Sequence, residues 1–265
     1  PINNRITCKM ITFKQFLTEE KNELSLEEAT SIIKSRCQKY LKLKIHLYRG
    51  IKESMGAFEG EVRKNRVPKD TSQTGHAILN EFFKKAFGVA ARSESLFVTP
   101  SRGIASGYGV AYEIFPLDDF DYIWSPILQD AYYLESTIPN PADTRGPAAK
   151  RLGVLLVGVI RKLWPASKPF SDNKLIDLVY HGEFDNPADE RLKLPKLFKN
   201  DSQSKKDRDL ILKTLLELHG DELYKFNAGI STNRENEVML VCDHYIAVSE
   251  QMAASVEFEE LLRGA

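Results

Sequence analysis

Arg49 is the first residue whose type and position suggest chemistry. It lies at the end of a strand predicted at 45–50, and Gly50 follows it. A guanidinium offers a rigid fork of donors that suits a phosphate, and a glycine lets a ligand come close to the backbone. An arginine at such a position is more commonly a surface residue in an ion pair, so Arg49 alone does not define a site.

Two hydroxyl groups follow another predicted strand, at 95–99. Thr99 and Ser101 flank Pro100 at its end. Such hydroxyls can bind a sugar or orient a carboxylate. The same residue types are also common in turns, which is the simpler interpretation when this segment is taken alone.

Two carboxylates stand at the start of an aliphatic strand predicted at 237–242. Glu235 and Glu237 are separated by one residue, so on an extended chain both side chains point to the same side. Like charges that lie close together separate their pKa values, which allows two different roles on one substrate. The alternative is a charged strand edge that discourages aggregation.

Composition and the absence of other motifs exclude several classes of protein. Lys+Arg 37 balances Asp+Glu 37, which excludes a polycation built to coat nucleic acid but leaves room for a local basic patch. The five histidines have no metal-ligand spacing, so no metal is expected, and the chain has neither a Walker loop nor a Gly-x-Ser-x-Gly nucleophile. The three cysteines are scattered, which indicates a reducing compartment. The longest apolar run, at 153–160, is too short to span a bilayer, so we expect a soluble, cytoplasmic protein without a membrane partner.

Helical periodicity and capping signals predict three helical regions. The first 44 residues are expected to be helical, with Ser25 and Glu28 forming a capping box. A second helix is predicted at 74–87, with Gly88 as its left-handed stop, and a third at 209–218.

Strands and loops account for the other segments. Besides the strands named above, we expect strands at 110–115, at 245–248 and at 153–160, where a short β-branched run favours a buried strand over a helix. Loops are expected at 51–74, 137–153 and 184–208. The basic stretch 63–66 is either a solvated loop or a phosphate-binding patch, and the first is the simpler interpretation.

Taken in order, the three segments resemble the motifs of mono-ADP-ribosyltransferases of the arginine–serine–glutamate class, a group that includes many bacterial toxins and phage enzymes. In that family the arginine follows the first core strand, as in Leu47-Tyr-Arg-Gly50. The serine motif is typically Phe-x-Ser-Thr-Ser, against Phe97-Val-Thr-Pro-Ser101 here, so Thr99 replaces the leading serine and Pro100 the central residue. The glutamate motif opens an aliphatic strand, as Glu235-Asn-Glu-Val-Met-Leu240 does.

The resemblance implies an α+β fold, namely an ADP-ribosyltransferase-like split β-sandwich. The whole chain, 1–265, would form one domain with N-terminal helices at 1–44. The separation between the serine and glutamate motifs is longer than usual for the family, which implies a large helical and loop insertion within 120–228.

The resemblance also implies that the protein transfers ADP-ribose from its co-substrate NAD and releases nicotinamide. Glu237 would stabilise the positive charge that develops on the ribose, through the ribose 2′-hydroxyl. Glu235 would position or deprotonate the acceptor. This hypothesis requires Glu237 to be open to solvent and not neutralised by an internal cation.

The remaining motif residues would bind NAD if the resemblance holds. Arg49 would pair with the pyrophosphate or adenosine side, and the backbone of Gly50 would hold the carboxamide. Thr99 and Ser101 would orient the ribose and Glu237, and Phe97 opens the same motif.

The acceptor is left open by the sequence. A glutamate at the position of Glu235 is associated in the family with arginine modification, so a protein arginine is the first choice, in the cytoplasm of a bacterial or phage-infected cell. The basic segments 63–69 and 193–208 make RNA or DNA the alternative acceptor. A free NAD glycohydrolase and an inactive binding or structural protein with the same fold are the other hypotheses.

Overall fold

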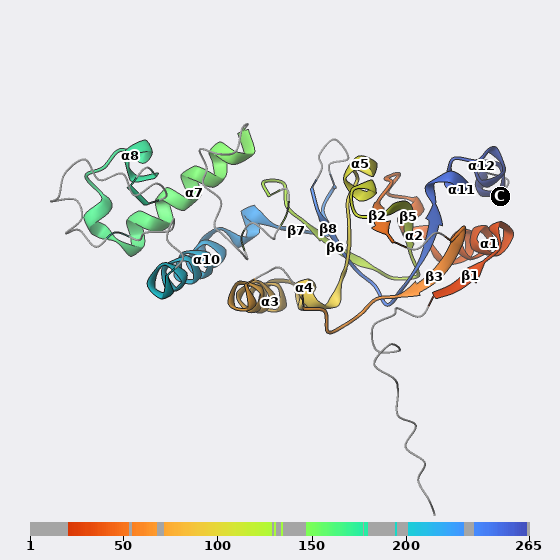
Figure 1. The fold of residues 1–265 in the computed structure, drawn as a ribbon, viewed down its shortest axis with the longest axis horizontal. Coiled ribbons are helices and arrows are strands. Elements are labelled where there is room, and N and C mark those ends of the chain that lie inside the picture. The colour runs from red at the N-terminus through yellow and green to blue at the C-terminus, as the bar shows by residue number, and fades with distance from the viewer. Residues whose placement is uncertain are drawn as a thin grey trace, which may run out of the picture.

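The computed structural model places two antiparallel β-sheets and a set of helices in an α+β arrangement (Figure 1). This confirms the expected α+β class. The structure describes residues 21–52, 55–67, 72–128, 130, 134, 147–176, 178–179, 194, 201–230 and 236–263. None of the helices in these ranges combines the length and the apolar character that a membrane-spanning segment needs.

The first sheet has five strands. Their order is β1 (Lys21–Leu24), β3 (Ala57–Glu61), β9 (His244–Ser249), β5 (Val110–Pro116) and β2 (Tyr48–Ile51). Each neighbouring pair is antiparallel. β3 falls within 51–74, where a loop is predicted, and β1 falls within 1–44, where helices are predicted; both strands find their partners far away in the sequence.

The second sheet has four strands, in the order β4 (Leu96–Val98), β8 (Val238–Val241), β6 (Asp121–Trp124) and β7 (Lys225–Phe226). One buried cluster contains side chains from both sheets, so one face of the second sheet packs toward the first. The alternation of a β-strand directs Val238 and Leu240 into this shared core and Met239 to the opposite face. That opposite face is covered by helices.

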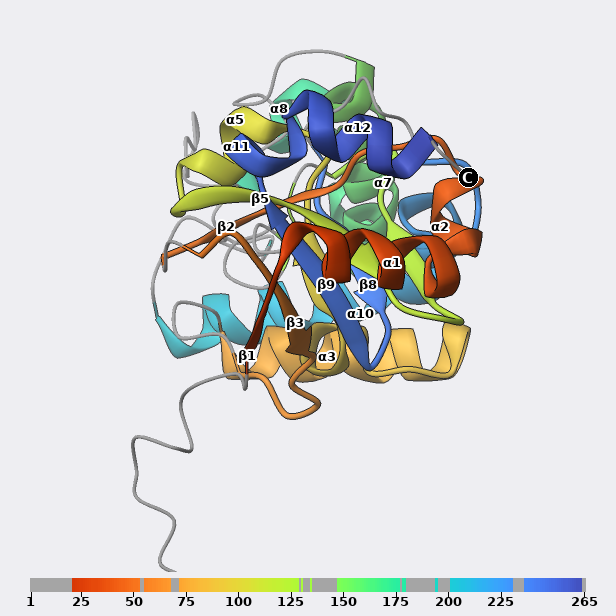
Figure 2. The same ribbon diagram turned by 90° about the vertical axis from the view of Figure 1, so that its right-hand side faces the viewer.

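Helices cover the first sheet at one end of the molecule. α1 (Leu26–Arg36) begins with the predicted capping box, in which Glu28 N donates to Ser25 Oγ at 3.2 Å and Ser25 N donates to Glu28 Oε2 at 2.8 Å. α2 (Gln38–Leu41) follows directly. α12 (Val256–Arg263) lies beside α1 (Figure 2), and α11 (Glu250–Ala253) packs on β5 and β9. The part of the helical prediction that covers 1–20 lies outside the described residues.

The predicted helix before Gly88 is present. α3 (Gln73–Phe87) ends at Gly88, whose φ of 80° is the left-handed conformation that glycine adopts without strain. The short helix α4 (Ala91–Glu94) leads from it into β4, and α5 (Arg102–Ser106) leads from β4 toward β5. α3 covers the outer face of the second sheet (Figure 1).

A helical region stands between β6 and β7, both of which are sheet strands inside the range 120–228 assigned to an insertion. It comprises α7 (Pro147–Leu163), the 3₁₀ turn η1 (Pro165–Ser167), α8 (Asp172–Ile176) and α10 (Ser202–Leu223). Figure 1 shows these helices at the end of the molecule opposite α1. α10 packs against both α3 and α7.

The strand predicted at 153–160 is wrong, because these residues lie within the helix α7. Their buried positions recur at helical spacing, with Leu152, Leu156 and Val159 buried and Val154 exposed. The loop predicted at 137–153 is wrong over 147–153 for the same reason, and 137–146 lie outside the described residues. The loop predicted at 184–208 is wrong over 202–208, where α10 begins, and 184–193 and 195–200 lie outside the described residues.

Candidate functional site

The arginine segment and the hydroxyl segment meet where the two sheets join. Tyr48 N donates to Thr99 O at 2.7 Å, and Thr99 N donates to Tyr48 O at 2.9 Å. This bridge links β2, at the edge of the first sheet, to the end of β4, at the edge of the second. Two segments that are about fifty residues apart in the sequence therefore share one short stretch of backbone pairing.

The glutamate segment reaches the same place through the second sheet. β4 and β8 pair antiparallel, with Val98 opposite Val238. Thr99 and Glu237 each stand one residue beyond this pair, so they lie at the same level of the sheet. The backbones of all three segments thus converge at the junction of the two sheets.

Arg49 spans the junction with its side chain. Its Nη1 donates to the backbone oxygen of Phe97 at 3.0 Å, and the residue is half-buried. Gly50 serves packing here, because a Cβ on it would lie 2.1 Å from Ala105 O and 2.8 Å from Tyr108 Cβ. The space that the glycine leaves open is therefore taken by α5 and the loop after it.

The two hydroxyl oxygens take part in local turns. Thr99 Oγ1 accepts from Ser101 N at 3.1 Å, and Ser101 Oγ accepts from Ile104 N at 3.3 Å as the N-cap of α5. Thr99 is buried and Ser101 half-buried. These contacts match the turn interpretation of the segment, and they fix the positions of both oxygens beside the junction.

Glu237 is paired with an internal cation. Arg92 Nη1 donates to Glu237 Oε1 at 2.8 Å, and the side chain of Arg92 is 3% exposed against 21% for Glu237. The carboxylate of Glu237 is therefore partly open to solvent, as the hypothesis from the sequence requires. It also has an internal cationic partner, which the same hypothesis required to be absent. Glu235 lies outside the described residues.

The residue that precedes Glu237 is also held in place. Asn236 is buried, and its Nδ2 donates to the backbone oxygen of Ser125, just after β6. Because Val238 is already in the sheet, the backbone of Glu237 is held from both directions.

Phe97 joins the arginines of the site. The guanidinium carbon of Arg66 lies 3.9 Å from the centre of its ring, and that of Arg92 lies 4.5 Å away. Its backbone oxygen accepts from Arg49. Three guanidinium groups thus contact one strand residue, and the Glu237 carboxylate is bonded to one of them, Arg92. Guanidinium groups suit phosphates, and a carboxylate suits a cationic centre.

Two members of this cluster were missed as site residues. Arg66 belongs to the basic stretch 63–66, where the phosphate-patch alternative pointed to it, while its neighbours Arg63 and Lys64 are exposed. Arg92 carries no sequence signal, because a single arginine after a helix is ordinarily a surface residue. Tyr108, 70% exposed and next to the Gly50 contact, is a further aromatic ring at this edge.

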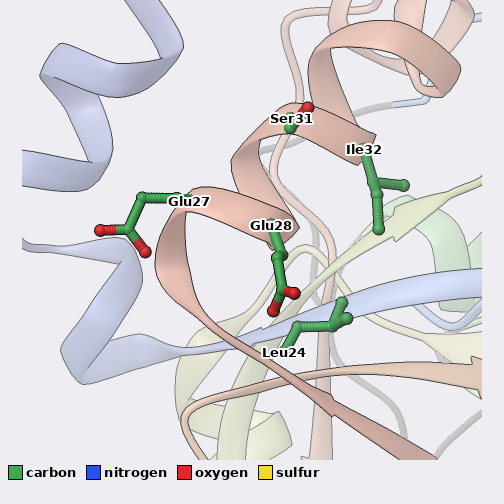
Figure 3. A pocket seen from close by; sticks show the side chains of 5 residues that line it. All are labelled: Leu24, Glu27, Glu28, Ser31 and Ile32. Carbon is green, nitrogen blue, oxygen red and sulfur yellow. The ribbon is translucent and has the colours of Figure 1, made fainter.

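A hollow elsewhere on the surface does not bring together charged residues from distant segments in this way. It is shallow and lies between β1 and α1 (Figure 3). Its lining residues are Leu24, Glu27, Glu28, Ser31 and Ile32. Glu28 is already used in the capping box, so this hollow has a structural explanation.

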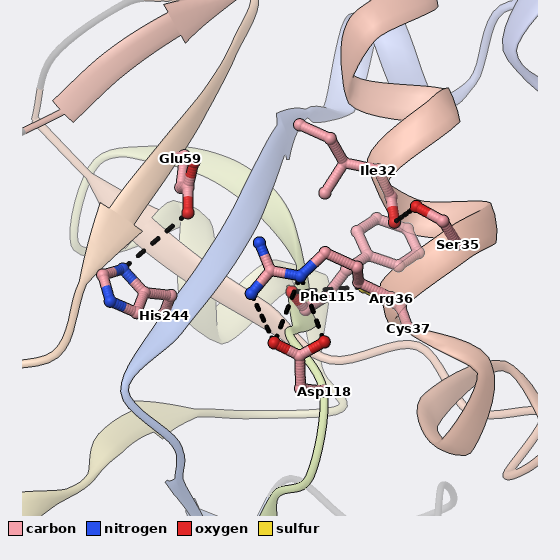
Figure 4. A network of polar contacts seen from close by, with 8 residues as sticks. All are labelled: Ile32, Ser35, Arg36, Cys37, Glu59, Phe115, Asp118 and His244. Carbon is pink, nitrogen blue, oxygen red and sulfur yellow. Dashed lines mark hydrogen bonds and ion pairs between the residues drawn. The ribbon is translucent and has the colours of Figure 1, made fainter.

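Charged residues near α1 also serve the fold. Arg36 Nε donates to both oxygens of Asp118, at 3.0 and 3.1 Å, and these bonds lower the pKa of Asp118 (Figure 4). They tie α1 to the turn after β5. Among the described residues, no group of three or more His, Cys, Asp or Glu side chains is placed to hold a metal ion.

Comparisons with known proteins return no relative: no family model, no curated protein and no solved structure matches this chain.

Proposed function

We propose that this chain is a mono-ADP-ribosyltransferase that transfers ADP-ribose from NAD to an arginine of a target protein. The observation that carries the proposal is the convergence of the three motif segments at the Tyr48–Thr99 bridge. In this proposal the two sheets form an ADP-ribosyltransferase-like split β-sandwich, and the junction is the nucleotide site. The helices between β6 and β7 are an insertion specific to this chain.

The residues at the junction fit NAD chemically. Guanidinium groups bind phosphate oxygens through paired, charge-assisted hydrogen bonds, so Arg49 and Arg66 would hold the pyrophosphate. Thr99 and Ser101 would bind ribose hydroxyls, and the Gly50 backbone the carboxamide. The ring of Tyr108 offers a flat apolar surface to a base.

Glu237 would stabilise the transition state. The bond between ribose C1′ and the nicotinamide nitrogen breaks, its electron pair leaves with nicotinamide, and the ribose becomes cation-like. A carboxylate held in place near that ribose stabilises the developing charge without reorganisation. The acceptor nitrogen then bonds to C1′, and its proton passes to Glu235 in this proposal.

Incubation with labelled NAD and a bacterial lysate tests the proposal. We expect labelled protein and released nicotinamide, and Glu237→Gln should reduce both by ~10²–10³. Glu222→Gln is the matched control, because Glu222 is a partly exposed glutamate that pairs with Arg151 away from the junction. Absence of nicotinamide release from the wild-type protein would refute the proposal.

The label also separates the acceptors. Label that survives nuclease but not protease supports a protein acceptor, and the reverse result supports RNA or DNA. Tandem mass spectrometry of the labelled peptides would show whether the modified side chain is an arginine. Nicotinamide release without any labelled macromolecule would identify a free NAD glycohydrolase.

A second candidate function is NAD binding without catalysis. The Arg92–Glu237 ion pair favours it, because a carboxylate that already has a cationic partner stabilises a second positive charge less strongly. Calorimetric titration with NAD distinguishes the two. Binding without nicotinamide release supports the second candidate, and neither binding nor release excludes both.

A further inference from the structure

Both the backbone and the guanidinium group of Arg92 are held by contacts with other residues. Its backbone N donates to Asn80 Oδ1 at 3.0 Å, which ties α4 to α3. Its guanidinium lies 4.5 Å from the ring centre of Phe97 and donates to Glu237 Oε1 at 2.8 Å. With 3% of the side chain exposed, Arg92 has little freedom to leave this position.

The neighbours of Arg92 reinforce this anchoring. Asn80 Nδ2 donates to Ser93 Oγ at 2.7 Å, and Arg66 N donates to Ser93 O at 3.1 Å. The segment after β3, the helix α3 and the helix α4 are therefore joined at Ser93. The guanidinium that meets Glu237 is thus part of a connected polar network.

The contact leaves Glu237 accessible. Its side chain is 21% exposed while Arg92 is buried, so the pair presents its acidic member to solvent. A fixed cation behind a partly exposed carboxylate restricts the orientation of that carboxylate.

We propose that Arg92 is a positioning residue, which holds the Glu237 carboxylate in one charged orientation at the sheet junction. This inference rests on the proposed ADP-ribosyl transfer and adds to it a residue outside the three motif segments. Arg92 reaches the reaction through Glu237 and has no direct role in the bond changes.

Other charged and titratable groups pack around the pair. Arg66 lies on the ring of Phe97, and Arg49 is bonded to the backbone oxygen of the same residue. His76 Nε2 lies 3.1 Å from Ser93 Oγ, in the network behind Arg92. Measurements of pH dependence therefore include Glu237→Gln and His76→Gln, so that the titration of each group can be assigned.

Kinetics of Arg92→Met and Arg92→Lys test the proposal. We expect kcat for nicotinamide release to fall about 10–100-fold in Arg92→Met, with KM for NAD nearly unchanged and the acid limb of the pH profile moved to higher pH. Arg92→Lys keeps the charge and should restore part of the loss. Arg151→Met is the matched control, because it breaks the more exposed Arg151–Glu222 pair between α7 and α10.

A titration that needs no turnover separates this inference from the proposed function. Carbon-13 NMR of labelled glutamate, assigned with Glu237→Gln, should show the proton affinity of Glu237 rising about tenfold or more in folded Arg92→Met. An unchanged titration and pH profile, or a kcat loss that only follows the unfolded fraction, would overturn the positioning role. A gain in activity would overturn it too, since Arg92 would then block the site. If Arg92→Met does not fold, the same measurements on Arg92→Gln, which also removes the charge, decide: an unchanged kcat and titration there also overturn the role.

Discussion

Tyr48 and Thr99 exchange two backbone hydrogen bonds. This pair joins the edge strand of the first sheet to the end of the edge strand of the second. The bridge is short, so its geometry depends on what packs beside it. α5 lies directly against Gly50, two residues from Tyr48. The junction therefore combines a backbone link with a close contact that admits no side chain.

Gly50→Ala should damage this junction. The added Cβ would lie 2.1 Å from the backbone oxygen of Ala105, and a backbone atom cannot move aside as a side-chain tip can. We expect a loss of roughly 1–3 kcal/mol in the free energy of unfolding, measured by denaturant titration, and a weakening of the proposed NAD binding. Gly158→Ala in α7 is the control, since nothing lies within 4 Å of its Cβ position and alanine favours a helix. Equal stability of Gly50→Ala and the wild-type protein would contradict the packing of α5 on β2.

His46 should make stability depend on pH in the neutral range. Its Nδ1 lies 2.7 Å from Glu113 Oε1, and this hydrogen bond raises the pKa of His46 in the folded protein. The protonated form is thus favoured by folding. The contribution is fully present below about pH 6.5 and is lost as pH rises through the folded-state pKa.

Denaturation curves across this range check the histidine prediction. Wild-type stability should fall more steeply with rising pH than that of His46→Gln. His244→Gln is the control, because His244 Nδ1 forms a longer ion pair, 3.8 Å from Glu59 Oε1, than His46 forms with Glu113 (Figure 4). Identical pH profiles for the wild-type protein and His46→Gln would show that the contact does not contribute.

Cys37 and Cys242 should resist modification in the folded protein. Burial raises the pKa of each thiol to about 12, so almost no reactive thiolate is present at pH 8. With Cys8 replaced by serine, iodoacetamide should label neither residue until denaturant is added, as mass spectrometry would show. Rapid labelling without denaturant would mean that these positions open to solvent in the native state.

Gly220 should be intolerant of a side chain, because it lets α10 approach α3. A Cβ there would lie 2.2 Å from Phe82 Cε2, and the Phe82 ring is itself packed 5.4 Å from the ring of Phe83. Gly220→Ala should therefore lower the free energy of unfolding by roughly 1–3 kcal/mol. Phe82→Leu should recover part of the loss in the double variant, which a double-mutant cycle measures. Simple additivity would contradict this contact.

Local signals were sufficient for several elements. The capping box of Ser25 and Glu28 and the glycine stop at Gly88 depend on residues three or four positions apart, and both are present. The aliphatic strands β8 and β9 also follow from their own residues. In each case the determining interactions lie within one turn or one strand.

The helix α7 is an example in which prediction from the local sequence pattern is wrong. Its apolar run packs on several sides at once, so the polar positions that would reveal a helical period are few and β-branched residues dominate the pattern. β1 and β3 fail for the opposite reason. β1 is mostly polar, and β3 combines the buried Ala57 and Phe58 with two glutamates. Both are strands because they pair with each other and, in the case of β3, with β9.

For the candidate site, the sequence by itself determined which motif residues are available and that each stands beside a strand. Only the tertiary structure decided what those residues meet. The register of β4 against β8 brings Glu237 level with Thr99, and α4 brings Arg92 to Glu237 from 145 positions away. Such contacts depend on how separate elements pack, and no spacing along a single chain encodes the partner of a charge that far away.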